Sequence, residues 1–98
     1  KNIKITGWLD EHAVYDLIRS GDLYLSTSQY EGLSFAALEA MSLKKALLLS
    51  DCVGNRDIIR QGVNGDLFSN KRVAITKIIQ YQNNREMLEV MGALSKDI

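Results

Sequence analysis

The sequence predicts an α/β fold, a partial doubly wound parallel sheet of about four strands with flanking helices, and three observations favour it. Strand-like and helix-like segments alternate three times along the chain, as expected for parallel strands joined by crossover helices. The apolar runs are short and unalternating, as in strands that helices cover on both faces. The chain has 98 residues, 46% of them hydrophobic, which fits one domain with a modest core.

The first three elements are a strand, a helix and a second strand. Residues 2–5 read as the first strand. A helix is expected over residues 11–20, because apolar residues recur there at helical spacing after the N-cap candidate Asp10. Gly21 ends that helix. Residues 22–25 form the next strand, followed by a polar turn.

The middle of the chain predicts a second helix, a buried strand and a short third helix. Residues 34–43 form the helix, and the apolar run 46–49 has the character of a covered strand. A loop over residues 51–55 precedes a short helix over residues 56–60.

The end of the chain predicts one more strand and two helices. A glycine-rich and asparagine-rich turn over residues 61–65 leads into a strand at 66–68. Helices over residues 74–82 and 85–95 follow. The asparagine pair between them breaks the helical pattern.

Composition excludes several classes of function. Twelve basic residues balance twelve acidic ones, so no long-range field attracts nucleic acid, and none is expected as a partner. No apolar run approaches the length of a membrane span, and the first residues do not resemble a signal peptide. Cys52 is the only cysteine, so neither an internal disulfide nor a cysteine metal site is expected.

Two glutamates, Glu31 and Glu39, stand eight positions apart around the start of the helix at 34–43. That helix start follows the second strand, at the edge of a parallel sheet where ligands bind. Its unpaired N–H groups suit a phosphate, and carboxylates suit sugar hydroxyls. The two α-carbons are on the order of 10 Å apart, too far to flank one bond as retaining-glycosidase carboxylates do at about 5 Å. The pair therefore suits an elongated ligand, and we expect both carboxylates to open onto a common cleft above the strands.

Three blocks of sequence resemble the retaining GT-B glycosyltransferases, family 4 in particular, with their Glu-x7-Glu motif. The blocks occur in the family's order and at its spacing. They comprise Ser28, Glu31, Gly32, Glu39, Ala40 and Met41, then Lys45 with Gly54, Asn55, Asp57, Ile58 and Ile59, and finally Gly62, Asn64 and Gly65. Lys44 and Val53 stand where the family usually has glycine, and Val53 is expected to narrow the freedom of a loop that faces the site.

The resemblance implies specific roles. Glu31 is the catalytic residue, because the first glutamate of the motif contacts the donor sugar near its reacting carbon. The second glutamate, Glu39, accepts hydrogen bonds from the ribose. The backbone between them approaches the sugar and diphosphate, so the donor-binding residues are Gly32, Leu33, Ser34, Phe35 and Glu39.

The resemblance also implies what the whole enzyme does. Residues 1–98 would be a fragment of a single C-terminal donor-binding domain, without the N-terminal acceptor domain and the first part of its own domain. The parent would transfer a hexose from a nucleoside diphosphate sugar to a glycan hydroxyl with retention, without metal or other cofactor. The basic residues that neutralise the diphosphate in the family are not in this chain, so the fragment alone is expected to be inactive.

The expected partners are the sugar-nucleotide donor and a glycan or lipid-linked acceptor that binds through the missing domain. The resemblance places the parent in polysaccharide biosynthesis in the cytoplasm, and peripheral association with the inner face of the membrane is part of this expectation. Two alternatives stay open from the sequence. One is a non-catalytic α/β interaction domain with solvated carboxylates, and the other is a GT-B-type sugar-nucleotide epimerase.

Overall fold

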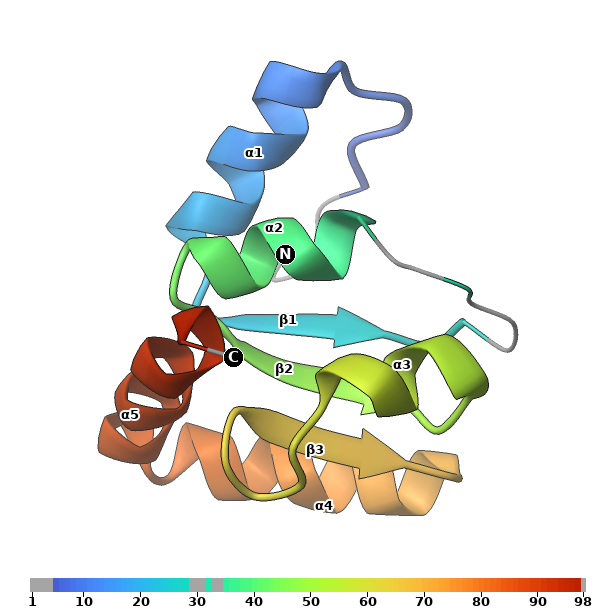
Figure 1. Ribbon diagram of the computed structural model, residues 1–98, viewed down its shortest axis with the longest axis vertical. Helices are drawn as coiled ribbons and strands as arrows, with labels where there is room; N and C mark the ends of the chain where they lie inside the picture. The colour runs from blue at the N-terminus through green and yellow to red at the C-terminus, as the bar shows by residue number, and fades with distance from the viewer. Residues whose placement is uncertain (1–4, 29–31, 33–34, 98) are drawn as a thin grey trace.

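The computed structural model describes residues 5–28, 32 and 35–97, and these form five helices and three strands (Figure 1). In chain order the elements are α1 (Glu11–Ser20), β1 (Leu23–Ser26), α2 (Phe35–Ser42), β2 (Ala46–Ser50), α3 (Val53–Ile58), β3 (Gly65–Phe68), α4 (Lys71–Gln82) and α5 (Arg85–Lys96).

The three strands form a parallel sheet in the order β1-β2-β3, which confirms the predicted α/β class. Leu25 of β1 stands opposite Leu48 of β2, which in turn stands opposite Asp66 of β3. A first strand was also expected at residues 2–5. Residues 2–4 lie outside the described residues, and Ile5 is 91% exposed and belongs to no strand.

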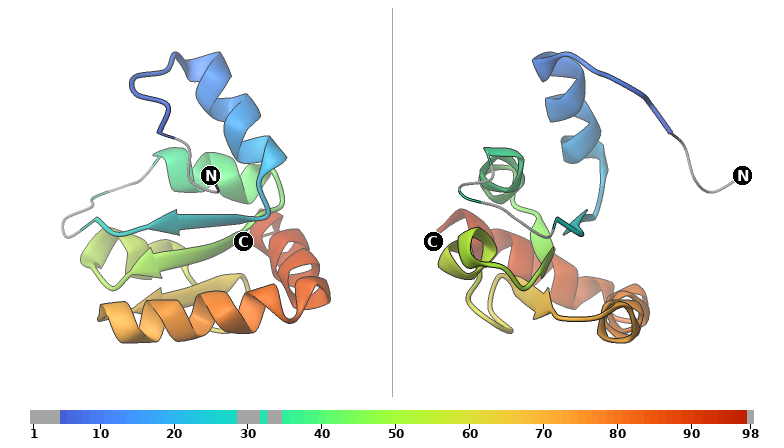
Figure 2. Two further views of the ribbon diagram at one scale, coloured as in Figure 1. Left: turned by 180° about the vertical axis from the view of Figure 1, so that it is seen from behind. Right: turned by 90° about the vertical axis from the view of Figure 1, so that its right-hand side faces the viewer.

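The central strand β2 separates two layers of helices (Figure 2). Successive side chains of a strand point to opposite faces. Leu47 and Leu49 accordingly pack in one buried cluster with residues of α2 and α3, and Ala46 and Leu48 pack in the other with residues of α4 and α5. All four are completely buried, which explains why β2 reads as an unbroken apolar run.

A tight turn carries the chain from α2 into β2. The amide of Lys44 donates to the carbonyl of Met41 at 3.0 Å, and the amide of Lys45 donates to that of Ala40 at 3.0 Å. This is the hydrogen-bond pattern of a Schellman motif, whose C′ residue is left-handed and usually glycine. Here that residue is Lys44, with φ of 63°. A Cβ on Gly92 of α5 would stand 2.0 Å from the Lys44 carbonyl oxygen, so only glycine lets α5 approach the turn.

Helix α3 differs from its prediction, because it begins at Val53 rather than residue 56 and ends at Ile58. Its end is set by Asn64, whose fully buried amide nitrogen donates to the Ile58 carbonyl at 3.0 Å. The Asn64 side-chain oxygen also accepts from the Arg60 amide at 2.7 Å. Val53 was expected to narrow the freedom of a loop that faces the site. That prediction was wrong, because Val53 is the first residue of α3 rather than part of a loop, and its side chain is 72% exposed.

The last two helices, α4 and α5, each begin after an asparagine N-cap. Asn70 accepts from the Val73 amide at 3.0 Å, so α4 begins three residues earlier than the apolar pattern alone predicts. Asn84 accepts from the Met87 amide at 3.1 Å and starts α5 where it was expected. Such caps satisfy N–H groups that have no partner inside the helix.

Candidate functional site

The predicted site helix, α2, has one buried face and one face that opens onto a groove. Ala37, Ala40 and Met41 are buried. The groove, of about 430 Å³, is lined by Phe35, Leu38, Glu39 and Ser42, which recur at helical spacing, and by Glu11 of α1. A smaller space of about 200 Å³ joins Glu39 to Glu11, His12 and Tyr15. The carboxylate of Glu39, in an otherwise apolar helix, therefore has an opening to solvent between α1 and α2.

The structure places only some of the predicted site residues. Glu31, Leu33 and Ser34 lie outside the described residues. Gly32 is exposed, and a Cβ built on it meets no atom within 4 Å. Phe35 is the first residue of α2 and is 74% exposed. Gly32 and Phe35 are therefore both exposed, while the common cleft expected for Glu31 and Glu39 stays a prediction.

A separate cleft of about 490 Å³ lies at the carboxyl ends of the strands. Figure 1 shows the three strands pointing toward the end of the sheet where α4 begins. The lining residues follow β1, β2 and β3 or start α4, and they are Thr27, Ser28, Ser50, Asp51, Phe68, Ser69, Asn70, Lys71 and Ala74. Glu39 is not among them. The carboxyl edge of a parallel sheet is where ligands of such folds bind, so this cleft is a second candidate site.

Polar residues under β3 form a buried cluster whose groups satisfy one another. Asp66 is 4% exposed and accepts hydrogen bonds from Gln61 at 2.9 Å and from the Tyr81 hydroxyl. Lys77 Nζ lies 3.5 Å from the same carboxylate. Burial, and then the hydrogen bond to Asp66, raise the pKa of Tyr81 above its usual range. Because every partner is internal, this cluster stabilises the packing of α4 on β3 rather than forming a binding site.

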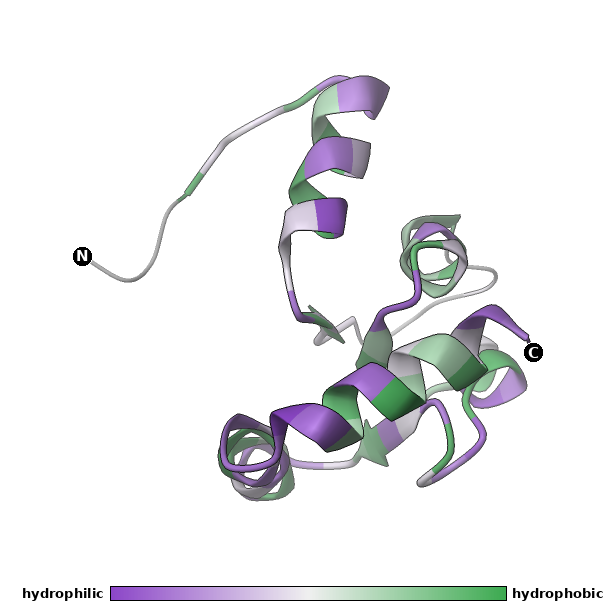
Figure 3. Ribbon diagram, turned by 90° about the vertical axis from the view of Figure 1, so that its left-hand side faces the viewer, coloured by the Kyte–Doolittle hydropathy of each residue, from purple (hydrophilic) through white to green (hydrophobic). Residues whose placement is uncertain are grey.

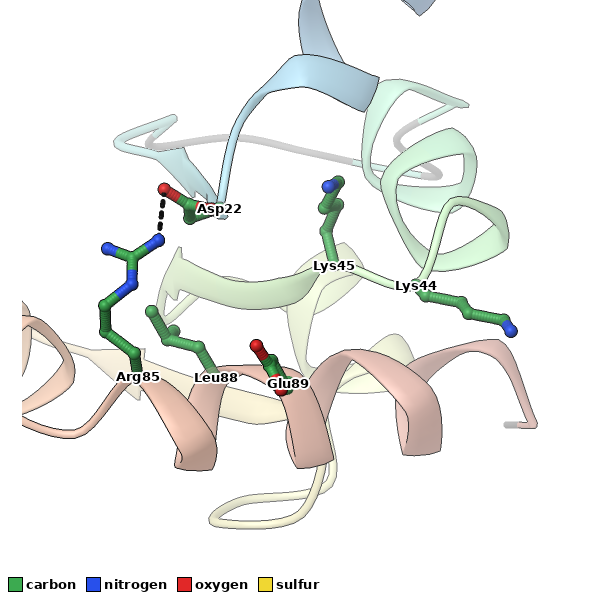
Figure 4. Close-up of a pocket in the computed structure, with 6 residues that line it drawn as sticks. All are labelled: Asp22, Lys44, Lys45, Arg85, Leu88 and Glu89. Carbon is green, nitrogen blue, oxygen red and sulfur yellow. Dashed lines mark ion pairs between the residues drawn. The ribbon is translucent and has the colours of Figure 1, made fainter.

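A small pocket of about 90 Å³ at the amino ends of the strands contains mixed charges (Figure 4). Arg85 pairs with Asp22 at 3.0 Å. Figure 4 shows the Lys45 ammonium directed away from Glu89, and the Lys44 side chain pointing away from the other labelled side chains. Three cations and two carboxylates line this pocket, and Arg85 is already paired with Asp22. Its volume is well below the roughly 300–1,000 Å³ typical of small-molecule sites, so it is not a candidate ligand site.

The described residues contain no group of three or more His, Cys, Asp or Glu side chains placed to hold a metal ion. In the same part of the chain, no helix has both the length and the apolar character needed to span a bilayer.

Comparison with known families identifies the chain. The family model described as "Glycosyl transferases group 1" matches residues 1–97. The chain belongs to this family. The membership favours the transferase prediction over a non-catalytic interaction domain.

The curated relatives with similar sequences are glycosyltransferases. The chain is 38% identical over 66 residues to a lipopolysaccharide 1,6-galactosyltransferase of Salmonella typhimurium, covering 64% of this chain and 18% of that protein. It is 30% identical over 63 residues to an α-D-kanosaminyltransferase of Streptomyces kanamyceticus, covering 64% of this chain and 16% of that protein. The chain thus spans less than a fifth of the length of these relatives.

Solved structures show the same fold. The C-terminal domain of the group 1 glycosyltransferase LpcC from Francisella tularensis superposes with a TM-score of 0.83 at 23% identity, covering 95% of this chain and 49% of that one. Anabaena HepE in complex with UDP-glucose superposes with a TM-score of 0.79 at 20% identity, covering 86% of this chain and 24% of that one. The fold is therefore that of part of a GT-B C-terminal, Rossmann-like domain.

Sequence reasoning missed the cleft at the strand ends. The sequence assigned no site role to Ser69, Asn70 or Lys71. A signal was present, since serine, threonine or aspartate directly follows or ends each of the three strands. In a parallel sheet these positions converge at one edge.

Proposed function

We propose that this chain is the donor-binding part of a retaining glycosyltransferase that belongs to family 4 and transfers a hexose from a nucleoside diphosphate sugar to a glycan hydroxyl. The observation that carries the proposal is the surface of α2. Its exposed start at Phe35 and the carboxylate of Glu39 one turn later lie along a single open groove. A phosphate at the helix start and a ribose beside the carboxylate fit that order.

Gly32 and its neighbours supply the sugar end of the proposed donor site. The open space beside Gly32 leaves room for a ligand against the backbone. We assign Leu33, Ser34 and Phe35 to the same contact through their backbone, and Glu31 to the reacting carbon as the catalytic residue. The complex of HepE with UDP-glucose supports a sugar nucleotide as the donor class.

The remaining parts of the reaction are assigned to segments of a longer protein. Positive charge that stabilises the leaving diphosphate is a large term in such catalysis. We propose that it comes from the first half of this domain, and that most of the acceptor site comes from an N-terminal domain. Neither a metal nor another cofactor is part of the proposal, and the enzyme is assigned to polysaccharide biosynthesis in the cytoplasm, at the inner face of the membrane.

Calorimetry of the full-length enzyme with UDP, GDP and ADP tests the donor assignment. Glu39→Ala should weaken binding of the preferred nucleotide by about 1–3 kcal/mol, the range for a hydrogen bond to a charged group. Glu86→Ala, on the exposed first turn of α5, is the matched control and should leave binding unchanged. Equal nucleotide affinities for the wild type, Glu39→Ala and Glu86→Ala would show that Glu39 does not contact the nucleotide.

Steady-state kinetics test the catalytic assignment. Glu31→Ala should lower kcat much more than it raises the donor KM, because its target is at the reacting carbon. NMR of the product should show the anomeric configuration of the donor. The 98-residue chain by itself should transfer no sugar, and turnover by it would contradict the proposed division of the site.

A further inference from the structure

The cleft at the carboxyl ends of the strands has the size and position of a ligand site, and none of the described residues of the proposed donor site lines it. Its volume of about 490 Å³ falls within the range of about 300–1,000 Å³ typical of small-molecule sites. Glu39 and Phe35 line a different groove, toward α1. The groove on α2 and the strand-end cleft therefore have no described lining residue in common.

Part of the cleft lining is fixed by internal hydrogen bonds. The Ser50 hydroxyl donates to the carbonyl of Ser28, and the Ser50 carbonyl accepts from Asn55 at 2.8 Å. The Asp51 amide donates to the Phe68 carbonyl at 2.8 Å, which ties the ends of β2 and β3 together. The wall of the cleft is therefore built on the sheet itself rather than on a free loop.

Other polar groups of the lining have no partner among the described residues. The hydroxyls of Thr27 and Ser69 and the ammonium of Lys71 take part in no hydrogen bond or ion pair within that part of the chain. All three side chains are exposed. They offer both donors and acceptors to a ligand in the cleft.

The charge of the lining decides which class of ligand fits. Lys71 contributes one positive charge and Asp51 one negative charge, and Asp51 is already paired with Arg56 at 2.5 Å. A diphosphate needs a site of net positive charge, so the donor diphosphate is a poor match. Hydroxyl groups of a neutral sugar both donate and accept, and they match a lining of hydroxyl, amide and single charged groups.

We propose that this cleft binds sugar hydroxyls of the acceptor glycan, so that the chain contributes to recognition of the second substrate as well as the first. This inference rests on the proposed transferase function. A transferase must hold two substrates at once, and the groove at Glu39 and the strand-end cleft are separate sites on one chain. In the chain, Ser28 of the cleft lining is followed after a few residues by Gly32 and then by α2.

The test uses the full-length enzyme with its nucleoside diphosphate sugar and a panel of octyl glycosides as acceptor probes. Two cleft variants are compared with the wild type, Lys71→Ala and the double variant Thr27→Val with Ser69→Ala. Each should raise the acceptor KM roughly 3- to 10-fold, the effect of losing one or two hydrogen bonds, with the donor KM unchanged. Arg72→Ala is the matched control, because Arg72 is an exposed cation on the next position of α4 outside the cleft.

Saturation-transfer NMR with the same glycosides, in the presence of UDP, measures acceptor binding without turnover. Weaker saturation in the cleft variants, but not in Arg72→Ala, would support the proposal. An unchanged acceptor KM, a raised donor KM, or no binding of any glycoside would overturn it. Loss of thermal stability with unchanged KM values would also overturn it, by showing that another part of the enzyme fills the cleft. A wild-type enzyme that transfers nothing from any sugar nucleotide would instead contradict the proposed function itself.

Discussion

Two regions of this chain differ in how they are held. Every buried residue among the described ones lies between Ala37 and Ser95, and residues 5–28 contribute none. Figure 3 shows α1 standing apart from the other helices, with apolar residues along one side. Ile18 is the one residue of α1 that packs against a buried cluster in this part of the chain, while Leu17 is 50% exposed.

A capped helix with an apolar stripe is therefore stabilised to a different degree in the two regions, depending on how much it packs against other elements. Helix α1 has an N-cap at Asp10 and an apolar stripe, yet its packing within the described residues is slight. Most helical stability in proteins comes from tertiary packing rather than from caps or propensity. The later region combines two apolar clusters with buried hydrogen bonds of Asn55, Asn64 and Asp66, so it should unfold as one unit while α1 opens separately.

The largest expected contrast in stability comes from replacing one glycine by alanine in each region. A Cβ at Gly65 would stand 1.9 Å from the carbonyl oxygen of Leu47, and neither backbone can move without breaking the sheet. Gly65→Ala should lower the free energy of unfolding by more than about 3 kcal/mol. Gly21→Ala, at the end of α1, meets atoms no closer than 3.6 Å and should change it little. Urea denaturation of both variants measures this contrast, and equal midpoints would contradict it.

A second pair compares two tyrosines. Tyr81 is 2% exposed and donates to Asp66, whereas Tyr15 is 38% exposed. Tyr81→Phe leaves a buried carboxylate with one donor fewer and should cost about 1–3 kcal/mol. Tyr15→Phe is the control and should cost almost nothing. Similar losses for the two variants would show that the buried cluster does not stabilise the fold.

The same tyrosine gives a pH dependence with a definite sign. The pKa of Tyr81 is raised in the folded state by burial and by Asp66. An unfolded tyrosine has a pKa of about 10, so just above that pH the Tyr81 hydroxyl loses its proton in the unfolded chain but keeps it in the folded one. This contribution to stability is present below that pH and is lost as the pH rises above it. Denaturation midpoints between pH 9 and about 11 should fall more steeply for the wild type than for Tyr81→Phe.

A smaller, stabilising effect is expected at the turn between α2 and β2. Lys44 has φ of 63°, a conformation that costs an L-residue roughly 1 kcal/mol relative to glycine. Lys44→Gly should therefore raise the free energy of unfolding by about 1 kcal/mol. Lys45→Gly is the neighbouring control, because Lys45 has no positive φ, and it should be neutral or destabilising. Calorimetric melting of both variants separates the two outcomes.

The smallest expected effect distinguishes the two regions by their helix caps. Asn70→Ala removes the cap of α4 and should lower global stability by about 1 kcal/mol. Asp10→Ala removes the equivalent bond of α1, which the Ala13 amide donates to the Asp10 carboxylate at 2.8 Å. If α1 opens on its own, this change should speed hydrogen exchange in α1 and leave the global transition in place. A common shift of the global transition in both variants would show that α1 unfolds with the rest.

The sequence predicted elements best where the pattern was local. Asp10, Gly21 and the break after Gln82 were correctly interpreted, because caps and helix breaks depend on a few neighbouring residues. The bounds of α3 were misplaced, and its end depends on the buried side chain of Asn64, which donates to the Ile58 carbonyl. Long-range hydrogen bonds of this kind leave no periodic signal.

The same distinction applies to the candidate sites. The sequence assigned Glu39 to a site through the motif resemblance, but it did not predict the groove toward α1 that Glu39 lines. The strand-end cleft was not predicted either, because it forms only when the segments after β1, β2 and β3 converge. Thr27, Ser50 and Ser69 are 23 and 19 positions apart in the chain, and only the parallel register of the strands brings them to one edge.

The buried side chain of Asn64 also bears on how the protein ages. Asparagine followed by glycine, as in Asn64-Gly65, is the pair whose amide is most readily attacked by the next backbone nitrogen, and asparagine is a thermolabile residue. The fold opposes that cyclisation, because hydrogen bonds to Ile58 and Arg60 hold the amide group in place. Deamidation should therefore proceed only from molecules that have opened, and the slow accumulation of aspartate or isoaspartate at this position would record how often the core unfolds during storage.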